Sequence, residues 1–380
     1  MARVLLIHQP VAGGVGRHVS DLARGLHTAG HEVVLCGPGR PATGPDDCRH
    51  VALTLERAVA PRADARALRD LDRIVRRLAP DLVHAHSSKA GAIARLVRAV
   101  HPRLPLVYSP HGYAFAGHFD REVERTAYRV IEAGLAPLAS RVICVCDAEA
   151  RLARRIGPAQ RIRVVHNGVA VADDPVMPDP RMTELARAGP VICTLTQLRP
   201  GKGLETLLDA MPAILGAHPG AQLAIWGDGP DQPQLAARAR TLSIGDSVHF
   251  LGATRSPLSV MAASDVFTLP SLAEAFPYVI LEAMSVACPV VSSDVGGIAE
   301  ALVEGTGVLV NPADPVALAT AIATLLDRPD MARRLGTAAR RRVQQMFSVE
   351  RMLSQTAQVY DALVPGFLGD AQGGHRACRV

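Results

Sequence analysis

The chain has 380 residues, of which 48% are hydrophobic and 20% are charged, a globular composition too long for one ordinary hydrophobic core. No stretch reaches the roughly 18 uninterrupted apolar residues of a membrane-spanning helix. The short apolar run in MARVLLIHQPVAGG is not typical of a signal peptide. We therefore expect a cytoplasmic protein of two domains, with its seven cysteines reduced and mostly placed in apolar strands.

The net charge of +5 is unevenly distributed along the chain. Residues 1–170 hold 25 Lys/Arg and 15 Asp/Glu, whereas residues 171–380 hold 16 and 21. A basic first half favours an anionic partner or peripheral contact with the inner face of the membrane, and a genome that prefers arginine is an equally good explanation. Nucleic acid is disfavoured, because basic and acidic residues alternate and only 3% of residues are aromatic.

The first half alternates apolar, strand-like runs with amphipathic helical patterns. Such alternation predicts parallel βαβ units. The predicted strands are 4–9, 31–37, 81–86, 105–110, 141–146 and 161–168, and the predicted helices lie near 16–29, 63–79, 88–100 and 120–139.

The second half repeats this alternation. Its predicted strands are 190–197, 221–229, 247–252, 265–270, 289–297 and 307–312, with helices near 203–216 and 231–242 among those between them. The segment 171–188 is rich in Pro and Asp and predicts a linker. The sequence thus predicts an α/β fold of two facing, Rossmann-like, doubly wound domains, 1–170 and 189–348, with a ligand cleft between them. The last helix, near 350–363, is expected to cross back onto the first domain.

Lys202 is one of only two lysines in the chain. It lies in a glycine-flanked turn, QLRPGKG, between a predicted strand and a helix expected to begin near Gly203. A helix N-terminus attracts anions, and a lysine adds a compact charge that suits phosphate. A solvated loop lysine is the plain alternative.

Two glutamates lie eight residues apart in SLAEAFPYVILEAMS. Glu274 is expected in the loop after a strand, and Pro277 suits the first turn of the helix that carries Glu282. Both carboxylates are then able to reach one ligand. An exposed helical position is the alternative for Glu282, but apolar residues surround it.

The glycines of VAGGVGRHV do not complete a GxGxxG pattern, and the acidic residue expected after the second strand is missing, so dinucleotide binding is disfavoured. His84 and His86 at one strand end and His111 at another are candidate hydrogen-bonding groups or general bases, with structural histidines as the alternative. A metal pair of His84 and His86 is disfavoured, because no third ligand is spaced to join them.

Taken together, these segments resemble the family-4 glycosyltransferases, which have the GT-B fold. The resemblance covers nearly the whole chain. Its most specific part is the pair Glu274 and Glu282, continued as EAMSVACPVVSSDVGGIAE, and GGVGRHV, HAHSSKAG, SPHGYAF, VHNGV and QLRPGKG follow the family's order.

The resemblance implies a retaining transfer of a hexose-type sugar from a nucleotide-sugar, UDP-linked by preference and GDP-linked second, to a hydroxyl acceptor. It implies a front-face mechanism with no metal and no cofactor. The implied catalytic residues are His111, Lys202 and Glu274. The implied donor-binding residues are Gly13, Gly14, Gln197, Arg199, Lys202, Glu274, Phe276, Pro277 and Glu282, and the implied acceptor-binding residues are His86, Lys89, His111 and Tyr113.

One departure touches the phosphate site. Gln197 stands where the family usually has an arginine, and Arg199 follows two residues later. The only DxD of the chain, Asp70-Leu71-Asp72, lies in a helical pattern where positions i and i+2 diverge.

The acceptor stays open. A lipid-linked saccharide precursor of a polysaccharide is the first hypothesis, supported by the basic first half and by Arg121, Arg125 and Arg129 in one helix. A soluble natural product or sugar is the alternative. A nucleotide-sugar-binding protein or an epimerase without transferase activity is the second alternative.

Overall fold

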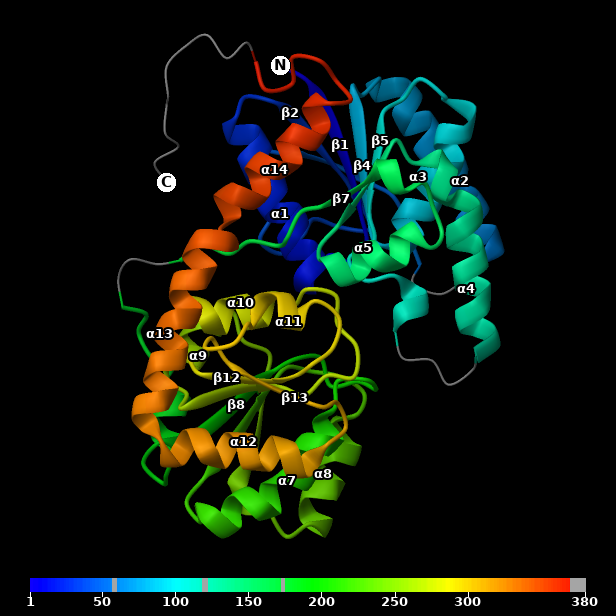
Figure 1. The fold of residues 1–380 in the computed structure, drawn as a ribbon. Coiled ribbons are helices and arrows are strands. Elements are labelled where there is room, and N and C mark those ends of the chain that lie inside the picture. The colour runs from blue at the N-terminus through cyan, green and yellow to red at the C-terminus, as the bar shows by residue number, and fades with distance from the viewer. Residues whose placement is uncertain (57–59, 118–121, 172–174, 370–380) are drawn as a thin grey trace. The chain divides into compact units, whose positions relative to one another are not determined.

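The computed structural model describes residues 1–56, 60–117, 122–171 and 175–369, and these form two compact units. The first unit holds residues 1–56, 60–115, 122–165 and 350–369, and the second holds 116–117, 166–171 and 175–349. Both are α/β units in which helices cover a parallel sheet (Figure 1).

The first unit is built on a seven-stranded sheet in the order β3-β2-β1-β4-β5-β6-β7, and every pairing in it is parallel. Its strands are β1 (Arg3–His8), β2 (Glu32–Gly37), β3 (Arg49–Ala52), β4 (Leu82–His86), β5 (Leu106–Ser109), β6 (Arg141–Cys144) and β7 (Ile162–Val164). Its helices are α1 (Gly13–Thr28), α2 (Pro61–Leu78), α3 (Ser88–Val100), α4 (Glu122–Leu135), α5 (Asp147–Arg154) and α14 (Val349–Asp361), with the 3-10 turns η1 (Ala114–Ala116), η2 (Ala136–Leu138) and η3 (Ala159–Arg161).

The second unit is built on a six-stranded parallel sheet in the order β10-β9-β8-β11-β12-β13. Its strands are β8 (Val191–Leu195), β9 (Gln222–Trp226), β10 (Val248–Gly252), β11 (Val266–Leu269), β12 (Val290–Ser293) and β13 (Val308–Val310). Its helices are α6 (Pro180–Leu185), α7 (Leu204–Ala217), α8 (Gln232–Thr241), α9 (Pro257–Ala262), α10 (Tyr278–Ser285), α11 (Ile298–Ala301), α12 (Pro315–Asp327) and α13 (Pro329–Met346), with the turn η4 (Gly245–Ser247).

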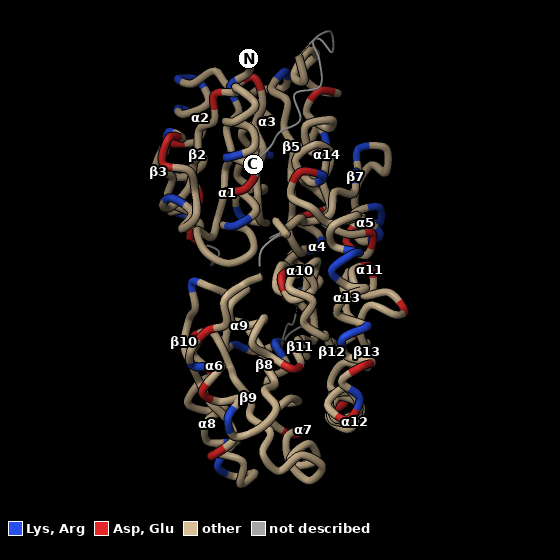
Figure 2. The backbone as a smooth tube through the Cα atoms, turned by 90° about the vertical axis from the view of Figure 1, so that its left-hand side faces the viewer, with Lys and Arg blue, Asp and Glu red and all other residues tan. Residues whose placement is uncertain are grey.

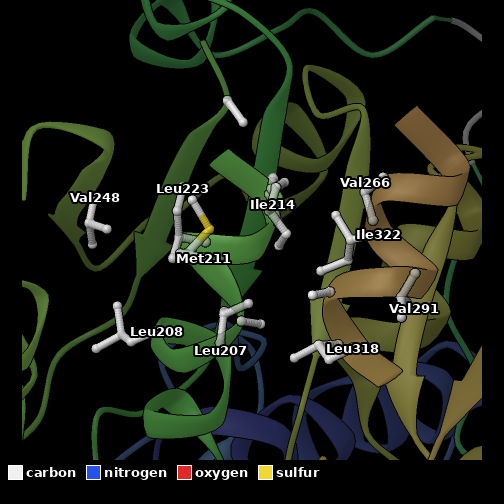
Figure 3. Packing of buried hydrophobic residues seen from close by; sticks show 14 of the residues in the cluster. Leu207, Leu208, Met211, Ile214, Leu223, Val248, Val266, Val291, Leu318 and Ile322 are labelled. Carbon is white, nitrogen blue, oxygen red and sulfur yellow. The ribbon is translucent and has the colours of Figure 1, made fainter. Parts of the chain in front are cut away.

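The core of the second unit shows how an apolar helix face holds the sheet. Leu207, Met211 and Ile214 recur at helical spacing on α7, and they pack with Leu318 and Ile322 of α12 against the strands (Figure 3). All five are 1% exposed or less. Burying one such side chain contributes about 1.5–3 kcal/mol.

Both sheets reverse their strand order at the same place. Counted within each unit, the order begins 3-2-1-4, so the first and fourth strands are neighbours: β1 beside β4 in the first unit, and β8 beside β11 in the second. The loops after these strands lead in opposite directions, which leaves a crevice at their carboxyl ends where ligands bind in such folds. Functional groups are therefore expected at the carboxyl ends of β1 and β4 in the first unit and of β8 and β11 in the second.

The segment predicted as a linker contains a helix that the sequence reading missed. Met182 of α6 is fully buried, and its sulfur accepts a hydrogen bond from Trp226 Nε1 at 3.4 Å. The Arg181 guanidinium lies 4.2 Å from the centre of the Trp226 ring. The part of the segment around α6 is therefore packed onto the second unit.

The last helix, α14, lies beside α1 of the first unit (Figure 1). A Cβ at Gly25 of α1 would meet the Leu353 side chain of α14 at 2.4 Å. Tyr360 of α14 is fully buried and hydrogen-bonds His84 of β4 at 2.5 Å. Helix α14 thus holds a side chain in the middle of β4.

Of the six described cysteines, Cys36, Cys144 and Cys193 lie in strands, whereas Cys48, Cys146 and Cys288 lie outside them, so only half are placed as the sequence predicted. Six cysteines are free and buried (Cys36, Cys48, Cys144, Cys146, Cys193 and Cys288), whereas Cys378 and Arg121 lie outside the described residues. None of the described helices is long and apolar enough to cross a bilayer. Basic and acidic positions are interleaved along the chain (Figure 2), as in α2, where Arg73 pairs with Asp70 and Arg76 with Asp72.

Candidate functional site

In the second unit, Lys202 lies in the loop between β8 and α7, directly before the helix. Gly203 is the N-cap and α7 begins at Leu204, as the sequence predicted. The unpaired N–H groups of this 14-residue helix start one residue beyond the lysine. Positive charge and helix-dipole charge therefore gather at the carboxyl end of β8.

Glu274 lies in the loop after β11 and contacts Lys202. Lys202 Nζ donates to Glu274 Oε1 at 2.5 Å, and both side chains are 14% exposed. Ser271 Oγ donates to the same oxygen at 2.8 Å. The structure thus joins two predicted site residues from neighbouring strand ends, 72 positions apart in the chain.

Two glycines allow the loops around this pair to approach one another. A Cβ at Gly203, whose φ is +67°, would lie 1.9 Å from the Pro270 carbonyl oxygen. A Cβ at Gly296, with φ +58°, would lie 1.8 Å from the Glu274 carbonyl oxygen. Only a residue without a side chain fits such contacts. The loops after β8, β11 and β12 therefore form one packed edge.

Glu282 is also placed as the sequence predicted, on α10. Although charged, it is 4% exposed. Pro277 directly precedes the first residue of α10. The side chain of Phe276 is buried. Its backbone carbonyl oxygen accepts a hydrogen bond from Asn167 Nδ2 at 2.7 Å, and this bond holds the loop before α10 in place.

Gln197 and Arg199 form a pair at the start of the Lys202 loop. Arg199 Nε donates to Gln197 Oε1 at 2.9 Å. Gln197 is exposed and Arg199 is half-buried. The guanidinium is therefore held next to the position where the family usually has an arginine.

In the first unit, histidines occupy the corresponding strand ends. His8 ends β1 and His86 ends β4, and the two face each other in the strand pairing. His86 Nδ1 and His111 Nε2 are 3.0 Å apart. His18 of α1 joins them, with its ring centre 4.5 Å from that of His111. The fold therefore groups His86 with His18 and His111 as candidate metal ligands, which the spacing along the chain did not predict, and not with His84.

Burial disfavours the charged form of His86 and His111. Burial lowers the pKa of His86 well below its usual range, and the neighbouring His84 and His111 lower it further. Burial and the neighbouring His18 lower the pKa of His111 in the same way. His84 bridges Tyr360 and Ser109 through its two ring nitrogens, at 2.5 and 2.8 Å.

Two non-glycine residues at these strand ends have strained backbones. Ser87 has φ +79° and ψ 160°, a region that only glycine adopts readily, and His111 has φ +55°. Ser87 N donates to the Ser109 carbonyl at 2.9 Å, which joins the two loops. Strain of this kind concentrates at functional sites.

Glu149 of α5 holds the His111 loop in place, and the sequence reading missed it. Its Oε1 accepts from Gly112 N at 2.6 Å and its Oε2 from Val145 N at 2.8 Å. Burial raises the pKa of this carboxyl to about 7. Glu149 follows the predicted strand 141–146, but the helix α5 that carries it was not predicted, so no local pattern pointed to this residue.

The other predicted site residues of the first unit lie in different surroundings. Gly13 and Gly14 begin α1. Lys89 Nζ pairs with Asp64 at 2.7 Å. Tyr113 is 4% exposed and its ring packs on Phe115 with centres 4.9 Å apart.

Known proteins are similar to the chain over most of its length. The family model of Glycosyltransferase Family 4 matches residues 12–173, and that of Glycosyl transferases group 1 matches residues 180–342. A glycogen synthase of Mycobacterium tuberculosis is 29% identical, over 96% of this chain and 95% of its own. An alpha-maltose-1-phosphate synthase of Mycolicibacterium smegmatis is 30% identical, over 92% and 95%. A UDP-Gal:alpha-D-GlcNAc-diphosphoundecaprenol alpha-1,3-galactosyltransferase of Escherichia coli is 28% identical over 67% of this chain and 66% of its own.

Among solved structures, the Anabaena protein Alr3699/HepE in complex with UDP-glucose has a TM-score of 0.81. It is 22% identical in sequence, and the match covers 95% of this chain and all of the other. This likeness shows the fold. With both family models matched in the predicted order, the chain belongs to the family-4 glycosyltransferases of GT-B fold and is an enzyme of the hexosyltransferase class.

Proposed function

We propose that this enzyme transfers a hexose from a nucleotide-sugar to a hydroxyl acceptor with retention at the anomeric carbon. The observation that carries the proposal is the contact between Lys202 and Glu274 at the N-terminus of α7. In the free chain the carboxylate neutralises the lysine. An ammonium group has three donors, so Nζ is able to keep Glu274 and still donate to a donor phosphate.

The departing diphosphate needs positive charge as its bond to the sugar breaks. In our proposal Lys202 and the N-H groups at the start of α7 supply it, with Arg199 anchored on Gln197 as a second cation. No metal is needed in this scheme, because the side chains carry the charge. The departing phosphate takes the acceptor proton on the same face of the sugar.

The remaining donor contacts follow from the loops of the second unit. We assign the ribose hydroxyls to Glu282 and the sugar hydroxyls to Glu274, with the backbone of Phe276 and Pro277 alongside. A UDP-sugar is the first choice of donor and a GDP-sugar the second. The names of two similar proteins, which mention UDP-glucose and UDP-Gal, support this order.

For the first unit we propose that His111 serves the sugar and the acceptor, with His86 behind it and Lys89 nearby. Gly13 and Gly14 at the start of α1 are assigned to the donor diphosphate. The strained backbone of His111 and its clamp by Glu149 support a fixed position for this imidazole. A fixed neutral histidine donates or accepts a hydrogen bond without a change in charge.

We favour a lipid-linked saccharide as acceptor, reached at the membrane through α4. This helix presents Val123, Val130 and Ile131 to solvent, with exposed fractions of 79%, 65% and 50%. The exposed Arg125 and Arg129 lie on the same helix, where Arg125 pairs with Glu122 at 2.6 Å. The exposed apolar side chains favour contact with a lipid surface. A soluble sugar acceptor is the second candidate, favoured by the similarity to an alpha-maltose-1-phosphate synthase.

The transfer assay offers the preferred donor with two acceptor classes, a diphosphoundecaprenol-linked saccharide and a set of free sugars and sugar phosphates. Nuclear magnetic resonance of the product assigns the anomeric configuration. We expect the configuration of the donor to be kept. An inverted product would overturn the retaining mechanism, and transfer to free sugars alone would overturn the lipid-linked acceptor.

A vesicle experiment tests α4 separately. Replacing Val123 and Ile131 with Asp should abolish sedimentation with vesicles that contain phosphatidylglycerol. The matched control is Val316→Asp on α12, a residue that is 74% exposed. Equal sedimentation of the two variants would overturn the membrane role.

A further inference from the structure

His18, His86 and His111 come from three different elements of the first unit and point at one spot. Each offers one ring nitrogen, and these three nitrogens lie within 4.8 Å of one another. The ring centres are 4.5 to 5.4 Å apart. Helix α1, the end of β4 and the loop after β5 converge there because β1, β4 and β5 are consecutive in the sheet.

The spacing suits a small divalent ion. Zn²⁺ binds imidazole nitrogens at about 2.0–2.1 Å in tetrahedral geometry, which puts two such nitrogens about 3.3 Å apart. His86 Nδ1 and His111 Nε2 are already 3.0 Å apart. Imidazole is a ligand for zinc, copper and nickel, whereas magnesium and calcium prefer oxygen.

One ring nitrogen of the cluster, His86 Nε2, is buried and has no hydrogen-bond partner among the described residues. Buried polar atoms are almost always paired, and the exceptions concentrate at functional sites. Neutral imidazole is the form that ligates metals.

We propose that His18, His86 and His111 form a binding site for a divalent transition metal of the Zn²⁺ type, and that its occupation inhibits the enzyme. Three protein ligands leave the fourth tetrahedral position open to water. The ion would hold His111, the residue that we assign to sugar and acceptor. The inhibitory half of this inference therefore rests on the proposed function, and the binding half does not.

Binding is measured first, on the chain without a polyhistidine tag and after treatment with a chelator that is then removed. Co²⁺ is titrated and followed by its ligand-field absorption, and Zn²⁺ by calorimetry. We expect one equivalent of metal per chain. His18→Gln, His86→Gln and His111→Asn should each weaken binding more than about tenfold.

The controls separate the site from surface histidines and from misfolding. His27→Gln removes an exposed histidine of the same helix α1 and should leave metal binding unchanged. His111→Asn keeps the loop, because asparagine tolerates the positive φ of this position. Circular dichroism melting checks each variant. Equal affinity in the native chain and in His111→Asn would overturn the site.

Inhibition is measured second, as release of nucleotide from the donor at rising Zn²⁺ concentrations. We expect half-inhibition at the dissociation constant found by calorimetry, and full recovery with chelator. Metal binding without inhibition would overturn the regulatory half alone. A chain that binds metal but no nucleotide-sugar would overturn the proposed function and leave the metal site standing.

Discussion

The two units share one sheet order and place different chemistry at the same strand ends. At the carboxyl ends of β8 and β11 the second unit carries an ion pair, Lys202 with Glu274. At the ends of β1 and β4 the first unit carries neutral imidazoles, among them His8 and His86. The fold fixes where a site forms, and the residues grafted on its loops decide what that site binds. Charge suits a diphosphate, and neutral hydrogen-bonding groups suit hydroxyl groups.

Removing the charge of the second unit should have the largest effect. Lys202→Ala is expected to lower kcat/KM by about 10²- to 10³-fold, as for the loss of one group that stabilises a leaving oxyanion. Some loss of stability is expected as well, because Glu274 loses the cation of a pair whose side chains are only 14% exposed. Steady-state kinetics and a thermal melt check both points.

Arg238→Ala is the matched control, because Arg238 forms an ion pair with Asp209 on the surface of the same unit at 2.6 Å. Its loss should leave kcat/KM unchanged. Normal turnover in Lys202→Ala would show that Lys202 does not stabilise the leaving diphosphate. The proposed contrast between a charged site in the second unit and a histidine site in the first would then be wrong.

Removing the second glutamate should have a smaller effect, confined to donor binding. Glu282→Ala is expected to raise the dissociation constant of the donor about 10- to 100-fold, the range for hydrogen bonds to a charged group. Calorimetry with the donor measures it. Glu184→Ala, an exposed glutamate of α6, should bind normally. A normal donor affinity in Glu282→Ala would show that Glu282 is a structural residue.

The close packing of loops in the second unit is tested by Gly203→Ala. The added Cβ meets the Pro270 carbonyl at 1.9 Å in a left-handed backbone, so we expect a loss of about 2–4 kcal/mol in the free energy of unfolding. Gly216→Ala in the same helix meets nothing within 4 Å and should be neutral or slightly stabilising. Chemical denaturation compares them, and equal stability of the two variants would contradict the packing argument.

In the first unit, a buried carboxyl predicts a dependence of stability on pH. Burial raises the pKa of Glu149 from its ordinary value of 4.5 to about 7. Between these values the folded chain binds more protons than the unfolded chain. Glu149 therefore stabilises the fold fully below pH 4.5, and this contribution is lost as the pH rises through 7.

Glu149→Gln should remove this dependence. Buried histidines such as His8 have lowered pKa values and change stability with the opposite sign, so the difference between native chain and variant isolates Glu149. We expect the native melting temperature to fall relative to that of the variant between pH 5 and 8. Parallel curves for the two proteins would show that the carboxyl titrates normally.

The sequence predicted most of the fold because apolar strands and helical periodicity alternate in both halves. It missed β3, a four-residue edge strand that is half-exposed and shows no apolar run. It missed α5 and α6, which are short and lie in charged or proline-rich segments. The predicted helix over 120–139 instead ends at Leu135 and continues as the turn η2.

The site residues divide in the same way. Lys202 and Glu274 were found because each lies in a distinctive local pattern, and the structure adds their contact. His18 carries no local signal, because it is an ordinary position within α1. Its partners come from strand ends that lie close only once β1, β4 and β5 have paired. The spacing of residues along the chain does not predict a cluster whose members come together only when the strands pair.

The most direct test of the account is donor binding across UDP-, GDP-, ADP- and TDP-sugars, with chelator present throughout, in the native chain and in Lys202→Ala. We predict that the native chain binds one donor class selectively, without any metal, and slowly releases its nucleotide, and that the variant loses this release. If no donor binds unless a metal is supplied, or if the lysine variant hydrolyses the donor as fast as the native chain, the assignment of diphosphate binding to Lys202 and its loop is wrong.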